Sequence, residues 1–322
     1  MFTSWVVAEL ISKGFTYLSM LAVPGGFLVL MLAGRHQFDV GLRRNLLLFY
    51  LIPACLLGIV AVSLFFLIQV GDINQRGLMG MLDRDMGALL ASTAIGDGLQ
   101  WRLNGFVLAL VAGGMAWVTL RSRPAGVRKP LIITAVAVLV ASLALGISFA
   151  VLGHVANLSL AGRTLIVLHF VAISLWGGAL VPLLMLLNRL NRAAADPATD
   201  GNHLRDQQRA AILILTDYGR LGWGFIGAML LSGVCLIWML LDSPADVFGT
   251  RYGRLLAVKL ALVTLLMTLG ALNKYRLVPA LDRSAVGAGA WLALRRSIRV
   301  ETALVLLVLT VTALFTTITG PA

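Results

Sequence analysis

Residues 153–184 read GHVANLSLAGRTLIVLHFVAISLWGGALVPLL. This stretch joins the end of one apolar segment, through a short polar turn, to a second segment long enough to cross a bilayer, which takes about 20 apolar residues. The pattern predicts a helical hairpin in a membrane. His154 ends the first helix and His169 lies early in the second. Histidine is costly in lipid, so both are expected to face the bundle interior or a water-filled cavity.

The composition of the whole chain agrees with a membrane protein. Its 322 residues are 59% hydrophobic and 12% charged, and the mean hydropathy is +0.93. Soluble domains carry about 25% charged residues. Long apolar runs recur without the alternation of a β-barrel, which predicts an all-α, polytopic helix bundle. The net charge of +12 lies mostly in short loops between the runs, which argues against nucleic-acid binding.

Eight transmembrane helices are expected in a single transmembrane domain, residues 1–322. The expected spans are 4–33, 45–70, 104–121, 131–153, 163–188, 217–241, 254–272 and 300–319. Pro24-Gly25-Gly26 predicts a kink or tilt in the first span. Segment 71–103 is expected to form a re-entrant or amphipathic helix packed on the bundle, and segment 189–209 a polar, solvated connector.

The placement of lysine and arginine predicts the orientation. Most of the 26 basic residues lie in one set of alternate loops, which the positive-inside rule makes cytoplasmic. Both termini and the turn between His154 and His169 are then periplasmic, at a bacterial inner membrane. The N-terminal sequence MFTSWVVAEL lacks the basic region and cleavage site of a signal peptide, so it is expected to remain in the first span.

Histidine and methionine supply the candidate metal ligands. Imidazole is a ligand for copper, zinc and iron, and His154 and His169 are expected to line one outward-opening vestibule. The alternative is two separate histidines, one interfacial and one hydrogen-bonded to a backbone carbonyl. Met79 and Met81 flank one glycine and could converge in an extended turn as thioether ligands suited to Cu(I), or could simply pack.

Four residues near the outer half of the spans are candidates for a pathway or for structural polar contacts. Trp176 follows His169 by seven residues and shares its helical face, and the next two glycines would let a neighbouring helix approach closely. Glu9 and Lys13 have the spacing of a helical ion pair. Lys259, near the outer end of its span, is expected to extend outward.

Two further candidates lie toward the cytoplasmic end. Glu301 opens the last span beside Arg296 and Arg299, and it is expected either to pair with one of them or to form an exit site for a cation. Asn273, at the inner end of its span, is a possible hydrogen-bonding residue between helices.

At these residues the chain resembles the CopD family of bacterial inner-membrane copper-resistance proteins, over about residues 90–322. The residues that carry the resemblance are Gly153-His154, Leu168-His169, Leu175-Trp176-Gly177-Gly178, Pro182, Thr250, Tyr252-Gly253-Arg254, the block KLALVTLLMTLGALNKYRLVPAL from Lys259 to Leu281, Arg296, Arg299 and Glu301. The resemblance implies copper movement from periplasm to cytoplasm, or copper handling within the membrane, with His154 and His169 as ligands. It also implies a separate periplasmic copper-binding partner of the CopC type.

The expected function is therefore a copper permease rather than an enzyme, with a copper ion of either oxidation state as its cargo. ATP-driven pumping is not expected, because the chain has no P-loop and no aspartyl-phosphate motif. Membrane lipid is the expected surrounding. Two alternatives stay open: a haem protein with His154 and His169 as iron ligands, and a non-transporting factor that delivers copper to a partner.

Overall fold

The computed structural model describes residues 4–122, 128–152, 156–240, 251–283 and 288–318. Within these ranges the chain is almost entirely helical and has no β-strand. The helical elements are α1 (Ser4–Arg35), α2 (Val40–Leu46), η1 (Leu47–Leu51), α3 (Ile52–Asn74), η2 (Leu78–Leu82), α4 (Arg84–Ala91), α5 (Ala94–Ser122), α6 (Arg128–Ala150), α7 (Leu160–Gly177), α8 (Leu180–Ala195), α9 (Gly201–Leu240), α11 (Arg251–Leu272), η4 (Asn273–Leu277), α12 (Val278–Arg283) and α13 (Ala288–Ile318). Eight helical segments in the described ranges are long and apolar enough to cross a membrane, which confirms the predicted all-α bundle.

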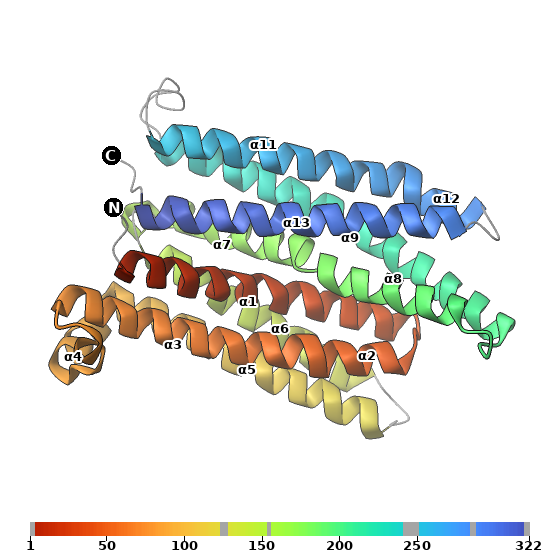
Figure 1. Cartoon of the computed structure of the whole chain (residues 1–322), viewed down its shortest axis with the longest axis horizontal. Helices are drawn as coiled ribbons and strands as arrows, with labels where there is room; N and C mark the ends of the chain where they lie inside the picture. Colours follow the sequence, from red (N-terminus) through yellow and green to blue (C-terminus); the bar gives the residue numbers. More distant parts are fainter. Residues whose placement is uncertain (1–3, 123–127, 153–155, 241–250, 284–287, 319–322) are drawn as a thin grey trace.

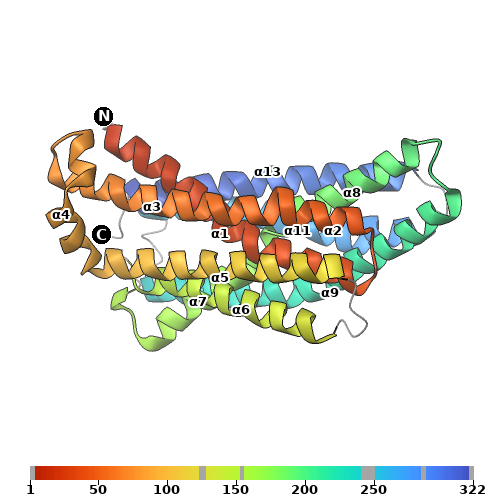
Figure 2. The ribbon, with the colours of Figure 1, turned by 90° about the horizontal axis from the view of Figure 1, so that it is seen from below.

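The helices lie side by side along the long axis of the molecule (Figure 1). Helix α1 is central and packs against α3, α6, α7, α9 and α13, whereas α11 packs mainly against α13 at one edge. Both chain ends lie at the same end of the bundle as α4, while α12 and the end of α8 lie at the other (Figures 1 and 2). This agrees with an even number of spans. Which end faces the periplasm stays a prediction.

The polar, solvated connector expected over residues 189–209 is largely exposed, as predicted, but most of it is helical. Helix α8 continues to Ala195 and α9 begins at Gly201. The side chain of Asp200 accepts a hydrogen bond from the backbone amide of Asn202 and so caps the start of α9. The 40 residues of α9 extend about 60 Å, far beyond a hydrocarbon core of about 30 Å, so its polar first turns project from the membrane.

A break between α7 and α8 brings two backbones into contact. Gly178 separates the two helices, and Pro182 follows it by four residues, so the Gly178 carbonyl lacks the amide that would otherwise bond to it. A Cβ placed on Gly178 would lie 1.9 Å from the carbonyl oxygen of Leu21. The predicted close approach of a neighbouring helix at Gly177-Gly178 is therefore confirmed, and the neighbour is α1, which stays one helix through Pro24.

Two π-helical turns, η1 and η4, interrupt the regular helices. In each, the amide after the turn bonds to the carbonyl five residues earlier: Ile52 to Leu47, and Val278 to Asn273. A proline lies one residue beyond each of these amides, in the helix that follows. Such turns re-aim side chains and are frequent at functional sites. Here η1 directs the Tyr50 hydroxyl to the Gly178 carbonyl at 3.3 Å.

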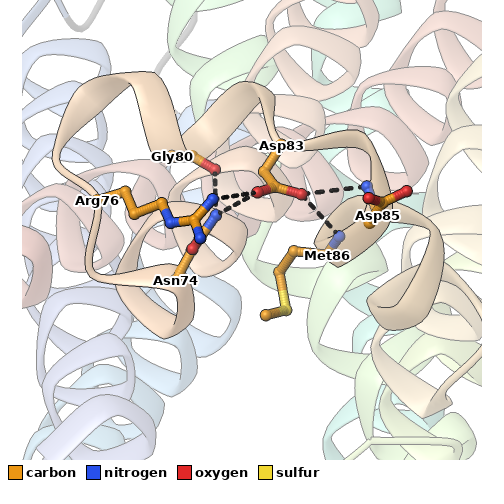
Figure 3. A network of polar contacts seen from close by, with 6 residues as sticks. All are labelled: Asn74, Arg76, Gly80, Asp83, Asp85 and Met86. Atoms are coloured by element: carbon orange, nitrogen blue, oxygen red, sulfur yellow. Dashed lines mark hydrogen bonds and ion pairs between the residues drawn. The ribbon is translucent and has the colours of Figure 1, made fainter.

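The segment between α3 and α5 is the amphipathic element predicted for residues 71–103. It contains η2 and α4, and it packs against α3 and α5. The carboxylate of Asp83 accepts hydrogen bonds from the amides of Met86 and Asp85 at the start of α4, and from Asn74 Nδ2 at 2.9 Å (Figure 3). These bonds hold the pKa of Asp83 below its usual value, and the bond from the Met86 amide contributes most. One carboxylate thus joins the end of α3 to the start of α4.

Candidate metal site and inner cavity

His169 lies in the third turn of α7 and faces α9. Its Nδ1 is 3.0 Å from the carbonyl oxygen of Met229 and 3.2 Å from the hydroxyl of Ser232. A carbonyl oxygen can only accept, so Nδ1 carries the hydrogen and the neutral ring keeps its lone pair on Nε2. A second hydrogen bond of this type is what orients histidines that bind metals. His169 is therefore prepared to act as a ligand through Nε2.

Helix α9 approaches this ring closely. A Cβ placed on Gly233 would lie 3.2 Å from Cε1 of His169, so a side chain there would crowd the imidazole. Lys259 of α11 is half-buried and near enough to His169 to act on it electrostatically. The expected outward extension of Lys259 did not predict that His169 would be its neighbour.

The other predicted metal ligands are not gathered around His169 in the described residues. His154 lies in segment 153–155, outside those residues. No group of three or more histidine, cysteine, aspartate or glutamate side chains suited to a metal occurs within the described ranges. A site at His169 therefore needs its further ligands from His154, from thioethers or from backbone oxygen.

Met79 and Met81 lie on the helical turn η2 instead of the expected extended turn. Met79 is 78% exposed. Met81 packs inward, with its Cγ 2.7 Å from the position of a Cβ on Gly71. The two thioethers thus differ in surroundings, although both lie on η2, which directly precedes α4 in the chain.

Trp176 is buried between two cavities. The smaller, of about 20 Å³, is apolar and is also lined by Met229 and Val263. The larger, of about 130 Å³, is lined by Tyr218 and Glu301 among others. Tyr218 donates a hydrogen bond of 2.6 Å from its hydroxyl to the Trp176 carbonyl. This bond fixes the last turn of α7. The Trp176 indole lines both cavities and so separates the small cavity next to Met229 from the larger one.

Glu301 and Asn273 meet at the larger cavity. Glu301 is 3% exposed and Asn273 is 8% exposed, and Asn273 Nδ2 donates a hydrogen bond to Glu301 Oε1. The predicted role of Asn273 as a hydrogen-bonding residue between helices is confirmed. Asn273 is the first residue of the π-helical turn η4, and its side chain points toward α13.

The expected ion pair of Glu301 with Arg296 or Arg299 is absent among the described residues, and both arginines are exposed. Residues two apart on a helix point to nearly opposite sides, so Arg299 faces outward when Glu301 faces inward. The helical phase likewise carries Arg296 away from the buried carboxyl group. The ion-pair interpretation of Glu301 was therefore wrong.

Glu9 and Lys13 also make no direct ion pair in the described part of the chain. The Lys13 ammonium group instead donates to the backbone carbonyl of Thr316 at 3.2 Å and to the hydroxyl of Thr317 at 3.0 Å. Glu9 remains close enough for electrostatic attraction. Lys13 therefore connects the first and last membrane helices at the end that carries both chain termini.

Two residues of this region had no separate signal in the sequence: Ser232 beside His169 and Tyr218 beside Trp176 lie in runs without a motif. Lys274, on the wall of the larger cavity, lies in the block that carries the family resemblance, but no role was predicted for it. The seven-residue spacing along α11 that places Lys259, Leu266 and Asn273 on one face was the available signal.

A bundle of eight candidate spans with a half-buried histidine and a buried carboxyl group defines a polytopic membrane protein. Residues 212–315 match the family model described as copper resistance protein D, CopD. This third of the chain is therefore similar to the CopD family, and the eight candidate spans are those of a multi-pass membrane protein. No curated protein and no solved structure matches the chain.

The matched segment is narrower than the resemblance over about residues 90–322. It covers most of α9 and α13 and all of α11, η4 and α12. Met229, Ser232, Asn273 and Glu301 lie within it, whereas His169 lies outside. The family match thus includes most walls of the larger cavity and the α9 side of the histidine site.

Proposed function

We propose that this chain is a copper permease that moves copper from the periplasm to the cytoplasm without ATP hydrolysis. The observation that carries the proposal is the hydrogen bond from His169 Nδ1 to the Met229 carbonyl. It leaves Nε2 available to a metal in the membrane-embedded part of the bundle, in a chain similar to the CopD family over residues 212–315.

In this proposal copper is captured at the end of the bundle that carries both termini. His154 would supply a second imidazole from the turn between α6 and α7. Met79 and Met81 would supply soft ligands from η2, at the same end (Figure 2). The positive-inside rule, applied to the basic loops at the opposite end, makes the capture end periplasmic.

From His169 the cargo would move along the inward face of α11 and past Trp176. Met229, next to the histidine, and Trp176 both line the small apolar cavity, and Trp176 also lines the larger one. Met267, with a soft thioether, lies on the wall of the larger cavity. Trp176 would have to shift for an ion to pass, so it is the expected gate of the pathway.

The test is copper uptake into proteoliposomes that enclose a copper-sensitive dye. The informative variant is His169→Asn, because its side-chain amide can still donate to the Met229 carbonyl but offers no imidazole nitrogen. We expect at least a ten-fold loss of uptake with normal folding. His203→Ala is the matched control, since His203 is exposed near the start of α9, and it should transport like the unchanged protein.

Unchanged uptake in His169→Asn would remove His169 from the pathway. An absorption spectrum of the same purified samples separates the haem alternative, since a Soret band lost on replacing His169 would favour iron ligation. Copper binding without any flux above protein-free vesicles would favour the delivery factor.

A further inference from the structure

The larger cavity lies where α9 and α11 diverge. Residues of α9 form one wall, α11 and η4 form the opposite wall, and Trp176 and Glu301 close the inner side. The volume of about 130 Å³ is well above the roughly 10–15 Å³ that a cavity needs to hold one water molecule, so it has room for several. Water is stable in such a space only where polar groups can bind it.

Asn273 supplies such a polar group. Its Oδ1 is buried, and no donor in the described residues lies within hydrogen-bonding distance of it. Its Nδ2 is already committed to Glu301. A buried amide oxygen without a partner in a cavity of this size is the expected position of a bound water molecule.

Glu301 is a carboxyl group without a nearby cation. No Lys, Arg or His nitrogen of the described residues lies within 4.0 Å of it, and its one described hydrogen bond comes from neutral Asn273. A buried carboxylate without a counter-ion is unstable, but the neutral acid is not. Gain and loss of a proton are thus open to this side chain when water reaches it.

The other charged and titratable groups around the cavity are few. Lys274 and Tyr275 come from η4 and Tyr218 from α9, whereas α7 and α8 contribute only Trp176, Leu180 and Leu183. Helix α1, which also packs on α13, has no charged residue between Lys13 and Arg35 and one tyrosine, Tyr17. A metal ion would need a set of ligands around Glu301, and the described lining supplies no second carboxylate, imidazole or thiol, whereas a proton needs no such set.

The outer wall of the cavity offers a route to bulk water. Lys274 Nζ donates to the Gly219 carbonyl at 2.6 Å and lies 4.9 Å from the centre of the Trp223 ring. The rings of Trp223 and Tyr275 are 6.0 Å apart, and both side chains are more than half exposed. Amphipathic rings of this kind gather at membrane–water interfaces, so this wall lies near the surface at the α12 end.

We propose that this cavity is a hydrated proton-exchange site in which Glu301, positioned by Asn273, takes up and releases a proton at the α12 end of the bundle. The carboxylate accepts a proton from a hydronium ion in the cavity to give the acid and water, and the reverse step returns the proton to water. Coupled to a proton gradient across the membrane, proton exchange at this position would let that gradient drive cargo movement. That coupling rests on the proposed copper transport, whereas proton exchange itself does not.

The first test therefore contains no copper. Proteoliposomes adsorbed on a solid-supported membrane are exposed to a pH jump, and the transient current from proton binding is recorded. The unchanged protein should give a transient that Glu301→Gln loses and Glu301→Asp retains. Glutamine keeps the shape and can still accept the bond from Asn273. Glu9→Gln is the matched control, because Glu9 is a carboxyl residue near the opposite end of the bundle, and it should retain the transient.

The second test measures copper uptake with and without a pH gradient. We expect the gradient to stimulate uptake by the unchanged protein and Glu301→Gln to lose at least nine-tenths of that stimulation. A transient of full size in folded Glu301→Gln would overturn the proton site while leaving copper transport standing. Copper binding is also measured in the His169→Asn variant and in the double variant with Glu301→Gln. If the first binds copper and the second does not, Glu301 is a metal ligand and the proton site is overturned. A Glu301-dependent transient without any copper uptake would instead leave the proton site standing and overturn the permease.

Discussion

Gly25 of α1 and Gly178 at the α7–α8 break meet backbone to backbone. A Cβ built on Gly25 would lie 2.2 Å from the carbonyl carbon of Gly178. The contact holds irregular backbone in the bundle interior, where lipid cannot satisfy it and protein must. The Gly178 carbonyl, freed by Pro182, accepts a hydrogen bond from Tyr50. A helix break beside Trp176 is thereby stabilised by the first membrane helix.

Replacing Gly178 with alanine should strongly destabilise the protein. The added methyl would collide with the Leu21 carbonyl, a backbone atom that can move only with α1. Overpacking of this kind costs about 1–3 kcal/mol and sometimes more, so thermal unfolding in detergent should shift clearly downward. Gly227→Ala is the control, since a Cβ there has open space and should leave stability unchanged or higher. Equal stability of the two variants would contradict the contact.

Ser232→Ala should weaken copper binding without unfolding the bundle. The Ser232 hydroxyl is one of two acceptors that hold His169 Nδ1, and loss of such an outer partner lowers metal affinity by about 10–100-fold in known sites. Titration of purified protein with copper should therefore show an increased Kd with an unchanged number of sites. Thr264→Ala on the exposed face of α11 is a suitable control. An unchanged Kd would mean that the Met229 carbonyl alone orients the ring.

Lys259→Leu should have the opposite effect on copper affinity. Lys259 acts electrostatically on His169, and removing a positive charge near a cation site lowers the repulsion between them. We expect Kd for copper to fall several-fold. Arg254→Leu, one of the exposed positions on the same helix, controls for general charge. A higher Kd in Lys259→Leu would show that the lysine supports the site through another contact.

The cap formed by Asp83 should depend on pH. Its pKa is lowered, chiefly by the hydrogen bond from the Met86 amide and then by that from Asn74, so the ionised form is favoured in the folded segment. The stabilisation is present above the ordinary pKa of aspartate and disappears as the pH falls through the lowered value. Hydrogen exchange of residues 77–91, corrected for intrinsic rates, should be faster in Asp83→Ala than in the unchanged protein at neutral pH. The difference should vanish in strong acid.

Asp85→Ala provides the comparison for this effect. The Asp85 carboxylate is exposed in the first turn of α4, while only its backbone amide bonds to Asp83. Its removal should change exchange little. If both variants speed exchange equally, charge at the helix start, and not the cap of Asp83, stabilises α4.

Hydropathy alone determined the class of this protein. Bilayer thickness fixes the length of an apolar helix, so eight spans and the amphipathic segment before α5 could be predicted from residue order. Polar residues inside those spans were visible for the same reason. Helix phase was also predictable in part, since the glycine pair after Trp176 indicated a close helix approach that the structure confirms.

The partners of the polar residues were decided by the tertiary structure. Glu301 was expected beside arginines close in sequence, but its partner is Asn273, 28 residues away and aimed by a π-helical turn. His169 bonds to α9, about 60 residues further along the chain. Sequence order constrains neighbours on one helix, whereas contacts between helices depend on the rotation and packing of whole spans, which small shifts in register change completely.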